Sequence, residues 1–305
     1  MATTEAPLEK KYVKTKIANL NASLMLAEDA SEREDEIVRH IKRVESDPVF
    51  QLDPEFPPGL EWFNSGPLSF QRELRGKIVI LDFFTYCCIN CMHILPDLAK
   101  LEEKYSDREG VVVVGVHSAK FRNEKVSDNI RNAIMRYSIS HPVVNDKDIV
   151  LWERLGVVCW PTLVIIGPNC QLLHCIIGEG HSDDLMSFMD AAVQYYKDSG
   201  KLSRDPVGIS LATKSLGASL LKFPGKVCTD VTGERLYVSD SAHNQILVVN
   251  KETGELISDV LIEGWGVEGE KMGRAEKGGG TEVISDNSMC AECWEQAYVF
   301  VATYT

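Results

Sequence analysis

The sequence predicts a mixed α/β sheet with helices on both faces, preceded by a helical segment and followed by an all-β segment. Three features lead to this prediction. The first 47 residues lack turn-forming clusters, apolar runs alternate with amphipathic stretches between residues 48 and 200, and glycine-containing loops separate short strand-like runs after residue 200. At 305 residues the chain is long enough for about two domains.

The composition is that of an ordinary globular protein, with 44% hydrophobic and 25% charged residues. The 32 basic and 45 acidic residues leave a net charge of −13, which repels phosphate backbones, so no nucleic-acid partner is expected. No apolar run approaches the ~18 residues of a membrane-spanning helix, and the opening residues lack a secretory signal. We therefore expect no membrane association. Nine cysteines, an odd number, are expected to be mostly reduced thiols in the cytosol.

Residues 1–47 are predicted to be helical because they carry mixed charge. Ser31 followed by Glu34 indicates a capping box at a helix start. Apolar residues then recur at helical spacing, namely Ile37, Ile41 and Val44. We expect a helical hairpin packed on its own domain, with a partner-binding helix as the alternative.

Residues 48–200 form the predicted α/β domain, which a proline-rich loop introduces. Apolar runs predict buried strands at residues 78–84, 111–116, 162–166 and 171–177. Amphipathic stretches predict helices at residues 92–105, 128–137 and 185–196. Strand–helix alternation that ends in a hairpin is typical of a mixed sheet.

The strongest chemical signal is the CxxC pair Cys88 and Cys91, at the junction of a buried strand and a helix. Two intervening residues in a first helical turn bring cysteine Cα atoms within the ~4.4–6.8 Å that a disulfide accepts. The unpaired N–H groups of a helix start also lower the pKa of a thiol placed there. We therefore expect Cys88 to be the exposed nucleophile and Cys91 to resolve the mixed disulfide.

Two other interpretations of the CxxC pair stay open. It could be half of a structural zinc site, which needs two further ligands. The candidate further ligands are Cys87, His93 and the distant pair Cys290 and Cys293. None of them supplies a convincing second pair of zinc ligands. It could also be a pair of inert thiols. We predict no metal centre.

Three landmarks surround the CxxC pair: Asp82 before it, Pro96 after it, and Trp160-Pro161-Thr162 at the start of a strand. With these landmarks, residues 50–200 resemble the thioredoxin superfamily, and most closely its TlpA-type redoxin branch. The resemblance implies a thioredoxin-like fold in which Asp82 relays a proton. It also implies that Trp160, Pro161 and Thr162 bind the substrate beside a cis-proline bond. Alternatively, Asp82 is a strand-end group satisfied by hydrogen bonds.

Two departures from the family pattern bear on activity. Cys87 stands where a tryptophan is usual, and the bulky Trp160 precedes the proline, next to Cys159. Cys87 and Cys159 are either auxiliary thiols near the redox pair or small buried apolar residues.

Residues 211–266 have all-β texture, with strand candidates at 210–211, 220–221, 235–239, 246–250 and 256–261. The stretch from Phe223 to Val227 and the His243-Asn244 hairpin resemble one NHL-type propeller blade. A propeller needs about four to eight blades to close, so this segment is predicted to be an incomplete propeller with unpaired edges. Residues 267–305 are expected to be a disordered tail.

Two functions follow, and they leave open whether the chain is an enzyme. The first is a cytosolic, monomeric thioredoxin-like protein that exchanges thiols and disulfides with protein partners. It would use Cys88, Cys91 and Asp82 and no cofactor beyond an external reductant. The alternative is a non-enzymatic interaction protein that uses the redoxin fold and the NHL-type segment for protein binding. The bulky Trp160 and the replaced tryptophan favour this alternative.

Overall fold

The structure is a computed structural model that describes residues 20–209, 211, 221, 223–229, 232–241, 243 and 245–261. The chain divides into two compact units, residues 1–134 with 138–215 and residues 135–137 with 216–305. The predicted disordered tail, residues 267–305, and the first 19 residues of the predicted helical segment lie outside the described residues.

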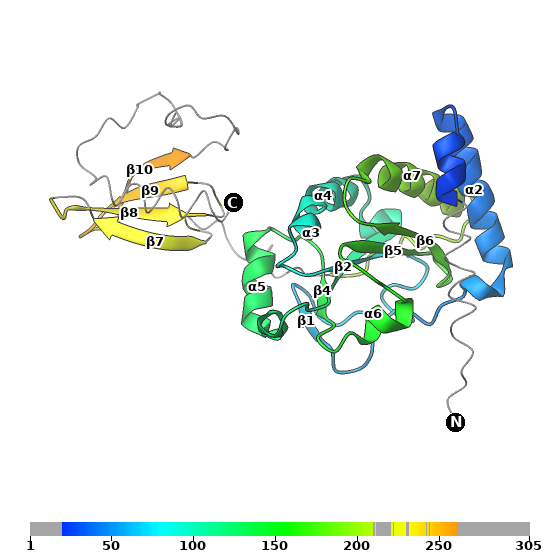
Figure 1. The fold of residues 1–305 in the computed structure, drawn as a ribbon, viewed down its shortest axis with the longest axis horizontal. Helices are drawn as coiled ribbons and strands as arrows, with labels where there is room; N and C mark the ends of the chain where they lie inside the picture. Colours follow the sequence, from blue (N-terminus) through cyan, green and yellow to red (C-terminus); the bar gives the residue numbers. More distant parts are fainter. Residues whose placement is uncertain are drawn as a thin grey trace. The chain divides into compact units, whose positions relative to one another are not determined.

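A six-stranded mixed sheet forms the centre of the larger unit (Figure 1). Its strands are β1 (Glu61–Phe63), β2 (Ile78–Phe84), β3 (Val111–His117), β4 (Val143–Asn145), β5 (Thr162–Ile166) and β6 (Leu172–Ile177). The order across the sheet is β1-β4-β3-β2-β5-β6. The β2–β3 and β3–β4 pairs are parallel, and the other three pairs are antiparallel.

Helices cover both faces of this sheet, which confirms the predicted α/β class. They are α2 (Ala30–Ser46), α3 (Ile89–His93), α4 (Leu95–Lys104), α5 (Ser127–Arg136), α6 (Val150–Leu155) and α7 (Ser182–Asp198), with 3-10 turns at Pro48–Phe50, Asp107–Glu109 and Arg122–Lys125. Residues 20–26 are also helical. Helices α4 and α7 cover one face, with α2 packed on α7, and α6 lies on the other face (Figure 1).

The two central strands β2 and β3 are buried along their whole length. Successive side chains of a strand point to opposite faces. Ile78 and Ile80 therefore pack beneath α4 and α7, whereas Val79 and Leu81 enter the core on the α6 side. A strand with two apolar faces reads as an unbroken apolar run, which is why the sequence predicts β2 correctly.

The start of α2 differs from the prediction. Asp29, not Ser31, precedes the helix, and its side chain accepts the backbone N–H of Glu32 at 2.8 Å. The Glu32 carboxylate in turn accepts the N–H of Glu28 at 2.8 Å. The predicted Ser31–Glu34 capping box is therefore wrong, because the helix begins one residue before Ser31 and Asp29 caps it. The predicted apolar stripe of α2 is buried as expected.

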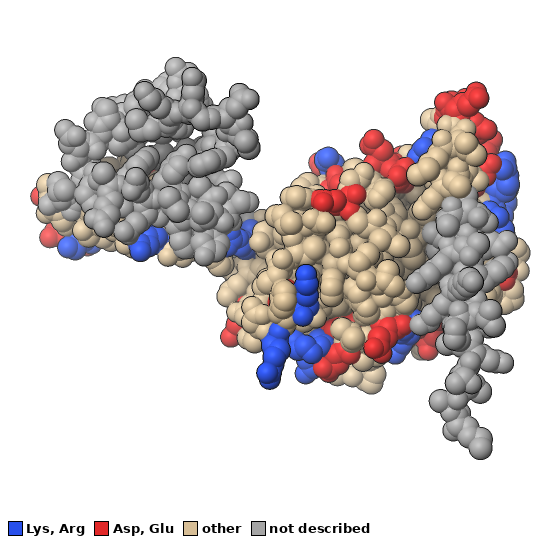
Figure 2. Space-filling model, in the orientation of Figure 1, with Lys and Arg blue, Asp and Glu red and all other residues tan. Residues whose placement is uncertain are grey.

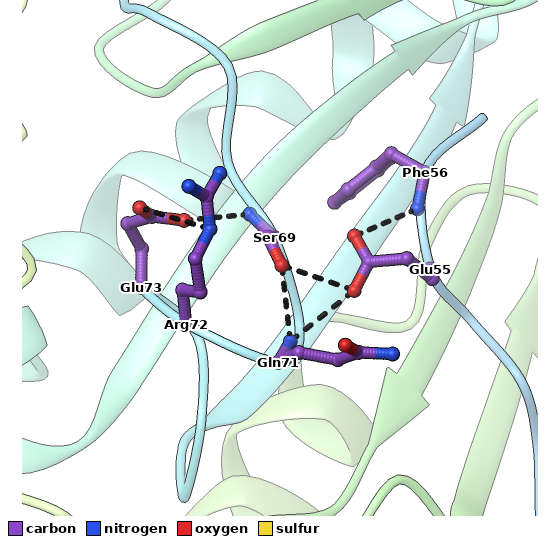
Figure 3. Close-up of polar contacts among 6 residues, drawn as sticks. All are labelled: Glu55, Phe56, Ser69, Gln71, Arg72 and Glu73. Atoms are coloured by element: carbon purple, nitrogen blue, oxygen red, sulfur yellow. Dashed lines mark hydrogen bonds and ion pairs between the residues drawn. The ribbon is translucent and has the colours of Figure 1, made fainter. Parts of the chain in front are cut away.

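A carboxylate holds together the loops that lead into the sheet (Figure 3). The Glu55 side chain accepts the Ser69 hydroxyl at 3.1 Å and the backbone N–H of Gln71 and Phe56 at 3.2 Å each. The Phe56 ring then packs against Phe70, with ring centroids 5.4 Å apart. These contacts fix the loops that, together with α6, cover this face of the sheet.

The larger unit continues past the predicted domain end at residue 200. The buried Lys77 ammonium donates to the backbone carbonyls of Asp107, Ser203 and Asp205 at 2.6–2.8 Å. Burial lowers the pKa of Lys77, and the nearby carboxylates of Asp107 and Asp205 oppose that shift. Residues 201–209 are therefore fixed along this unit.

In the smaller unit, four strands form one antiparallel sheet in the order β10-β9-β8-β7. They are β7 (Pro224–Thr229), β8 (Arg235–Asp240), β9 (Gln245–Asn250) and β10 (Leu256–Leu261). The sheet agrees with a single propeller blade. Of the two earliest strand candidates, Leu211 and Leu221 are described, and neither lies in a strand; the other two residues lie outside the described ones.

The blade's β8–β9 hairpin contains a buried carboxylate. Asp240 accepts the backbone N–H of Phe223, and His243 Nδ1 lies 2.6 Å from its other oxygen. His243 thus lies in the hairpin where it was expected, and its neighbour Asn244 is outside the described residues.

Charged residues lie mainly toward the margins of the face that Figure 2 presents, and the middle of the larger unit's face carries other residue types. Within the described ranges, no helix combines the length and the apolar character needed to cross a membrane.

Candidate functional site

The turn between β2 and α3 presents the two cysteines of the CxxC pair. Cys88 is the residue before α3 and has extended backbone angles of −98° and 112°. Its N–H donates to the Thr85 carbonyl at 3.1 Å, and its own carbonyl accepts the N–H groups of Cys91 at 3.1 Å and Met92 at 3.3 Å. These bonds place the two cysteines one turn apart.

The two thiols differ in exposure. Cys88 is half-buried, whereas Cys91 is fully buried among the side chains beneath α3. Burial raises the pKa of Cys91, and the negative charge of Asp82 adds to the shift. Both sulfurs are free thiols in this structure. An attacking group from outside therefore meets Cys88 first.

The helix after the pair is interrupted, although the sequence predicts one helix from Met92 to Tyr105. Helix α3 ends at His93, and α4 begins at Leu95 after Ile94. Pro96 explains the break, because a proline has no N–H to donate to the carbonyl four residues earlier. The CxxC turn therefore leads into a short helix that is distinct from α4.

The loop before β5 reaches the same site from the far end of the chain. The Trp160–Pro161 bond is cis, and the Pro161 carbonyl accepts the Gly178 N–H at 2.9 Å. Thr162 starts β5, and its hydroxyl donates to the Cys159 carbonyl at 2.9 Å. Trp160 packs in the apolar cluster that also contains Cys88 and Cys91. The fold thus brings the predicted docking loop against the predicted redox pair.

Asp82 lies buried near the end of β2, on the face of the sheet that Phe84 and Cys91 also occupy. Neither carboxyl oxygen has a hydrogen-bond partner among the described residues. Burial raises the pKa of Asp82 to about 7; His141 opposes this shift and Glu102 adds to it. The alternative of a strand-end carboxylate satisfied by hydrogen bonds is therefore wrong. This carboxyl can both take up and release a proton near neutral pH.

Cys87 is exposed rather than buried, so the interpretation as a small buried apolar residue fails for it. Its N–H donates to Glu124 at 3.2 Å. Desolvation of the sulfur by neighbouring atoms and the Glu124 carboxylate together raise the pKa of Cys87 to about 11. Cys87 is therefore a protonated thiol at neutral pH, and only its thiolate would be a strong nucleophile. Cys159 is half-buried, with its sulfur 4.0 Å from the Thr162 hydroxyl.

Sequence reasoning missed Glu124, which organises the edge of this site. Its buried carboxylate accepts the N–H groups of Lys120 and Phe121 at 2.6 Å each, and the Thr85 hydroxyl also donates to it. Although burial opposes ionisation, these hydrogen bonds lower the pKa of Glu124. No local pattern signals this role, since the donors come from two separate loops.

His117, at the end of β3, is fully buried between the rings of Phe84 and Tyr86. Burial lowers its pKa to about 4, so the ring stays neutral and acts as a packing group.

The zinc alternative finds no geometric support in the part of the chain that the structure describes. There, no three histidine, cysteine, aspartate or glutamate side chains are grouped as metal ligands would be. His93 instead lies 2.5 Å from Glu179. Cys290 and Cys293 are outside the described residues.

The sheet order, the CxxC turn and the cis-proline loop define a thioredoxin-like domain, and residues 76–172 match the family model described as thioredoxin-like. About three quarters of the chain is similar to NHL repeat-containing protein 2. It is 50% identical to the Bos taurus and Homo sapiens proteins over 234 residues, which are 76% of this chain and 32% of each relative. The chain therefore spans about a third of the length of these relatives.

Two further similarities extend this comparison. Protein SUPPRESSOR OF QUENCHING 1, chloroplastic, from Arabidopsis thaliana is 50% identical over 214 residues, 69% of this chain and 20% of that protein. Among solved structures, the solution structure of a thioredoxin-like protein in the oxidized form has 21% identity and a TM-score of 0.43, covering 47% of this chain and 95% of that one.

Proposed function

We propose that the thioredoxin-like domain exchanges thiols and disulfides with protein partners through Cys88 and Cys91. The observation that carries this proposal is the pairing of a half-buried thiol with a fully buried one, beside a carboxyl group that has no hydrogen-bond partner among the described residues. Such an arrangement supplies an attacking thiol, a resolving thiol and a group that can take the second thiol's proton.

In the reducing direction, the Cys88 thiolate attacks one sulfur of a partner disulfide. A Cys88–partner bond forms, the partner's S–S bond breaks, and the first partner thiolate leaves. Cys91 then gives its proton to the Asp82 carboxylate and attacks Cys88, which releases the second partner thiolate. Two electrons pass to the partner, and an external dithiol must reduce the Cys88–Cys91 disulfide again. The same steps in reverse oxidise a partner.

Exposed apolar side chains in the CxxC motif and before the cis-proline loop favour a protein as the partner. Ile89, inside the CxxC motif, is 64% exposed, and Val158, before the cis-proline loop, is 63% exposed. A largely apolar pocket of about 710 Å³ borders Val158 and Thr162. A peptide that pairs with the loop before β5 would have room there for an apolar side chain. We expect the domain to act as a monomer in the cytosol, where reduced thiols are maintained.

The experiment is the reduction of insulin disulfides by the full chain, compared with Cys88→Ser. Cys170→Ser is the matched control, because it removes a half-buried thiol at the turn between β5 and β6, away from the pair. We expect turnover by wild type and by the control, and its loss in Cys88→Ser. Negligible turnover in all three proteins, each shown to be folded, would contradict the proposal.

The alternative, a non-enzymatic interaction protein, has one observation in its favour. Trp160 packs against the cluster that contains both cysteines, and its ring centroid lies 4.5 Å from that of Trp152. The alternative expects such a bulky side chain beside the thiols, at the position before the proline. The reduction potential of the pair separates the cases: a value near the thioredoxin value of about −270 mV supports a cytosolic reductase.

A further inference from the structure

Gly115 leaves a space beside the buried Asp82. The two residues lie directly opposite each other in the parallel β2–β3 pair, so their side-chain positions share one face of the sheet. A Cβ atom at Gly115 would lie 3.3 Å from His141 Nε2, 3.0 Å from the Phe84 ring and 3.1 Å from Val143. The His141 ring therefore occupies the space that a side chain at position 115 would fill.

His141 connects this buried space with helix α4. Its side chain is 3% exposed, and Nε2 has no hydrogen-bond partner among the described residues. The other ring nitrogen, Nδ1, lies 3.3 Å from Glu102 Oε2, and the same oxygen accepts the Ser140 hydroxyl at 2.7 Å. In the His141 ring, Nε2 thus lies near Gly115 without a hydrogen-bond partner among the described residues, and Nδ1 lies near the Glu102 carboxylate.

Glu102 reaches the surface, because its side chain is 23% exposed. Together with Ser140 and His141 it lines a pocket of about 360 Å³, whose rim includes Glu103 and Ser106. The exposure therefore increases stepwise, from fully buried Asp82 through His141 to Glu102 and the pocket.

Two charged groups of this path act on Asp82: Glu102, on α4, and His141, in the loop before β4. The Asp82 charge in turn acts on Cys91, in α3. A positive His141 favours the ionised form of Asp82, and a negative Glu102 disfavours it.

We propose that His141 and Glu102 carry the proton that Asp82 receives from Cys91 out to this pocket. The inference rests on the proposed function, since it describes what happens after Cys91 loses its proton. Neither Asp82 oxygen is hydrogen-bonded to His141 Nε2 in this structure, so the ring must first move into hydrogen-bond distance through the space beside Gly115. Asp82 then passes the proton to His141 Nε2, and His141 releases the proton on Nδ1 toward Glu102 and the water of the pocket. One proton leaves per resolution step, no electron moves along this path, and Asp82 is again ionised. Exchange of the remaining ring proton from Nε2 to Nδ1 through the water of the pocket restores the starting tautomer of His141 before the next cycle.

The test compares the full-length wild type with His141→Gln and Glu102→Gln. The Asp82 carboxyl is titrated by carbon-13 NMR in the reduced protein, and the resolution of a preformed Cys88 mixed disulfide is timed at several pH values. His174→Gln is the control, because His174 is a buried histidine whose Nδ1 also lacks a partner among the described residues.

We expect the Asp82 midpoint to rise in His141→Gln and to fall in Glu102→Gln, while the control leaves it unchanged. The resolution rate near neutral pH should drop by about tenfold in both variants. Loss of packing alone would not move the midpoint in opposite directions. Charge effects alone would change the two resolution rates in opposite directions, so a rate loss in both variants is the result that supports the proton path. Midpoints that move the same way, or unchanged rates in an active protein, would overturn the proton path only. A wild type that never resolves the mixed disulfide would overturn the proposed function as well.

Discussion

The Glu124 carboxylate holds the backbone of Cys87 through an N–H···O bond of 3.2 Å and lies close enough to raise the pKa of the Cys87 thiol. One residue of the Arg122–Lys125 turn thus acts on the thiol adjacent to Cys88, the proposed attacking cysteine. Desolvation of the Cys87 thiol and the negative charge of Glu124 both raise the pKa of Cys87 and disfavour its thiolate. We therefore expect Cys87 to react slowly with electrophiles at neutral pH.

Glu124→Gln should make Cys87 more reactive. The amide keeps an oxygen that can accept the backbone N–H, but it removes the negative charge that disfavours the thiolate. The thiolate fraction rises roughly tenfold for each unit by which the pKa falls. Labelling of Cys87 with iodoacetamide, followed by mass spectrometry, measures this. Glu73→Gln, which changes a carboxylate that accepts the Ser69 N–H, is the control. Unchanged labelling of Cys87 would contradict the electrostatic account.

Cys88 should alkylate faster than every other thiol of the chain at neutral pH. The comparison with Cys91 is the sharpest, because Cys91 is fully buried and its pKa is raised by that burial. We expect a rate difference of roughly tenfold or more between the two. Competitive labelling of the reduced chain gives both rates in one experiment. Equal rates would be incompatible with the assigned roles of attacking and resolving thiol.

Asp82→Asn should stabilise the protein at alkaline pH. Because the folded-state pKa of about 7 lies above the ordinary value of 3.8, the folded state binds more protons between these values. Wild-type stability is therefore fully present below about pH 4 and declines as the pH rises through 7. The penalty for the ionised carboxyl approaches about 4 kcal/mol above pH 7.

Urea denaturation of the wild type and Asp82→Asn at pH 4.5 and pH 8 measures this difference. The variant should gain most of the roughly 4 kcal/mol at pH 8 and little at pH 4.5. An equal gain at both pH values would show that the effect is not ionisation of Asp82.

Gly115→Ala should destabilise the domain by about 1–3 kcal/mol, because the added methyl group meets three packed side chains at 3.0–3.3 Å. Gly66→Ala is a matched control, since a Cβ there meets nothing within 4 Å. Thermal unfolding of both variants tests the prediction. A Gly115→Ala protein as stable as the control would mean that His141 can leave its position freely.

The sequence was sufficient for the long elements of the sheet but not for the short ones. Buried runs predicted β2, β3, β5 and β6, whereas β1 and β4 escaped notice. Each of these two has three residues, too few for a periodic signal. Helix α6 has six residues and was missed for the same reason. In the smaller unit, β7 was not predicted as a strand, because it begins with Pro224 and Gly225 and both residue types are uncommon within strands.

The candidate site divides in a similar way. Cys88, Cys91, Asp82 and Pro161 stand in local motifs, so the sequence could single them out. Glu124, Glu102 and His141 acquire their roles only when distant segments meet. His141, for example, reaches the neighbourhood of Asp82 because position 115 has no side chain, a relation between two strands and a loop that no spacing encodes.

The contact between Trp160 and the cluster around Cys88 and Cys91 makes the indole a built-in optical reporter. A disulfide is an efficient quencher of indole emission, and a dithiol quenches much less. Closure of the Cys88–Cys91 bond would therefore dim the fluorescence of Trp160, with Trp152 beside it as an energy-transfer neighbour. Oxidation and reduction of the Cys88–Cys91 pair would then change the intensity of Trp160 fluorescence, which can be followed in solution without an attached dye.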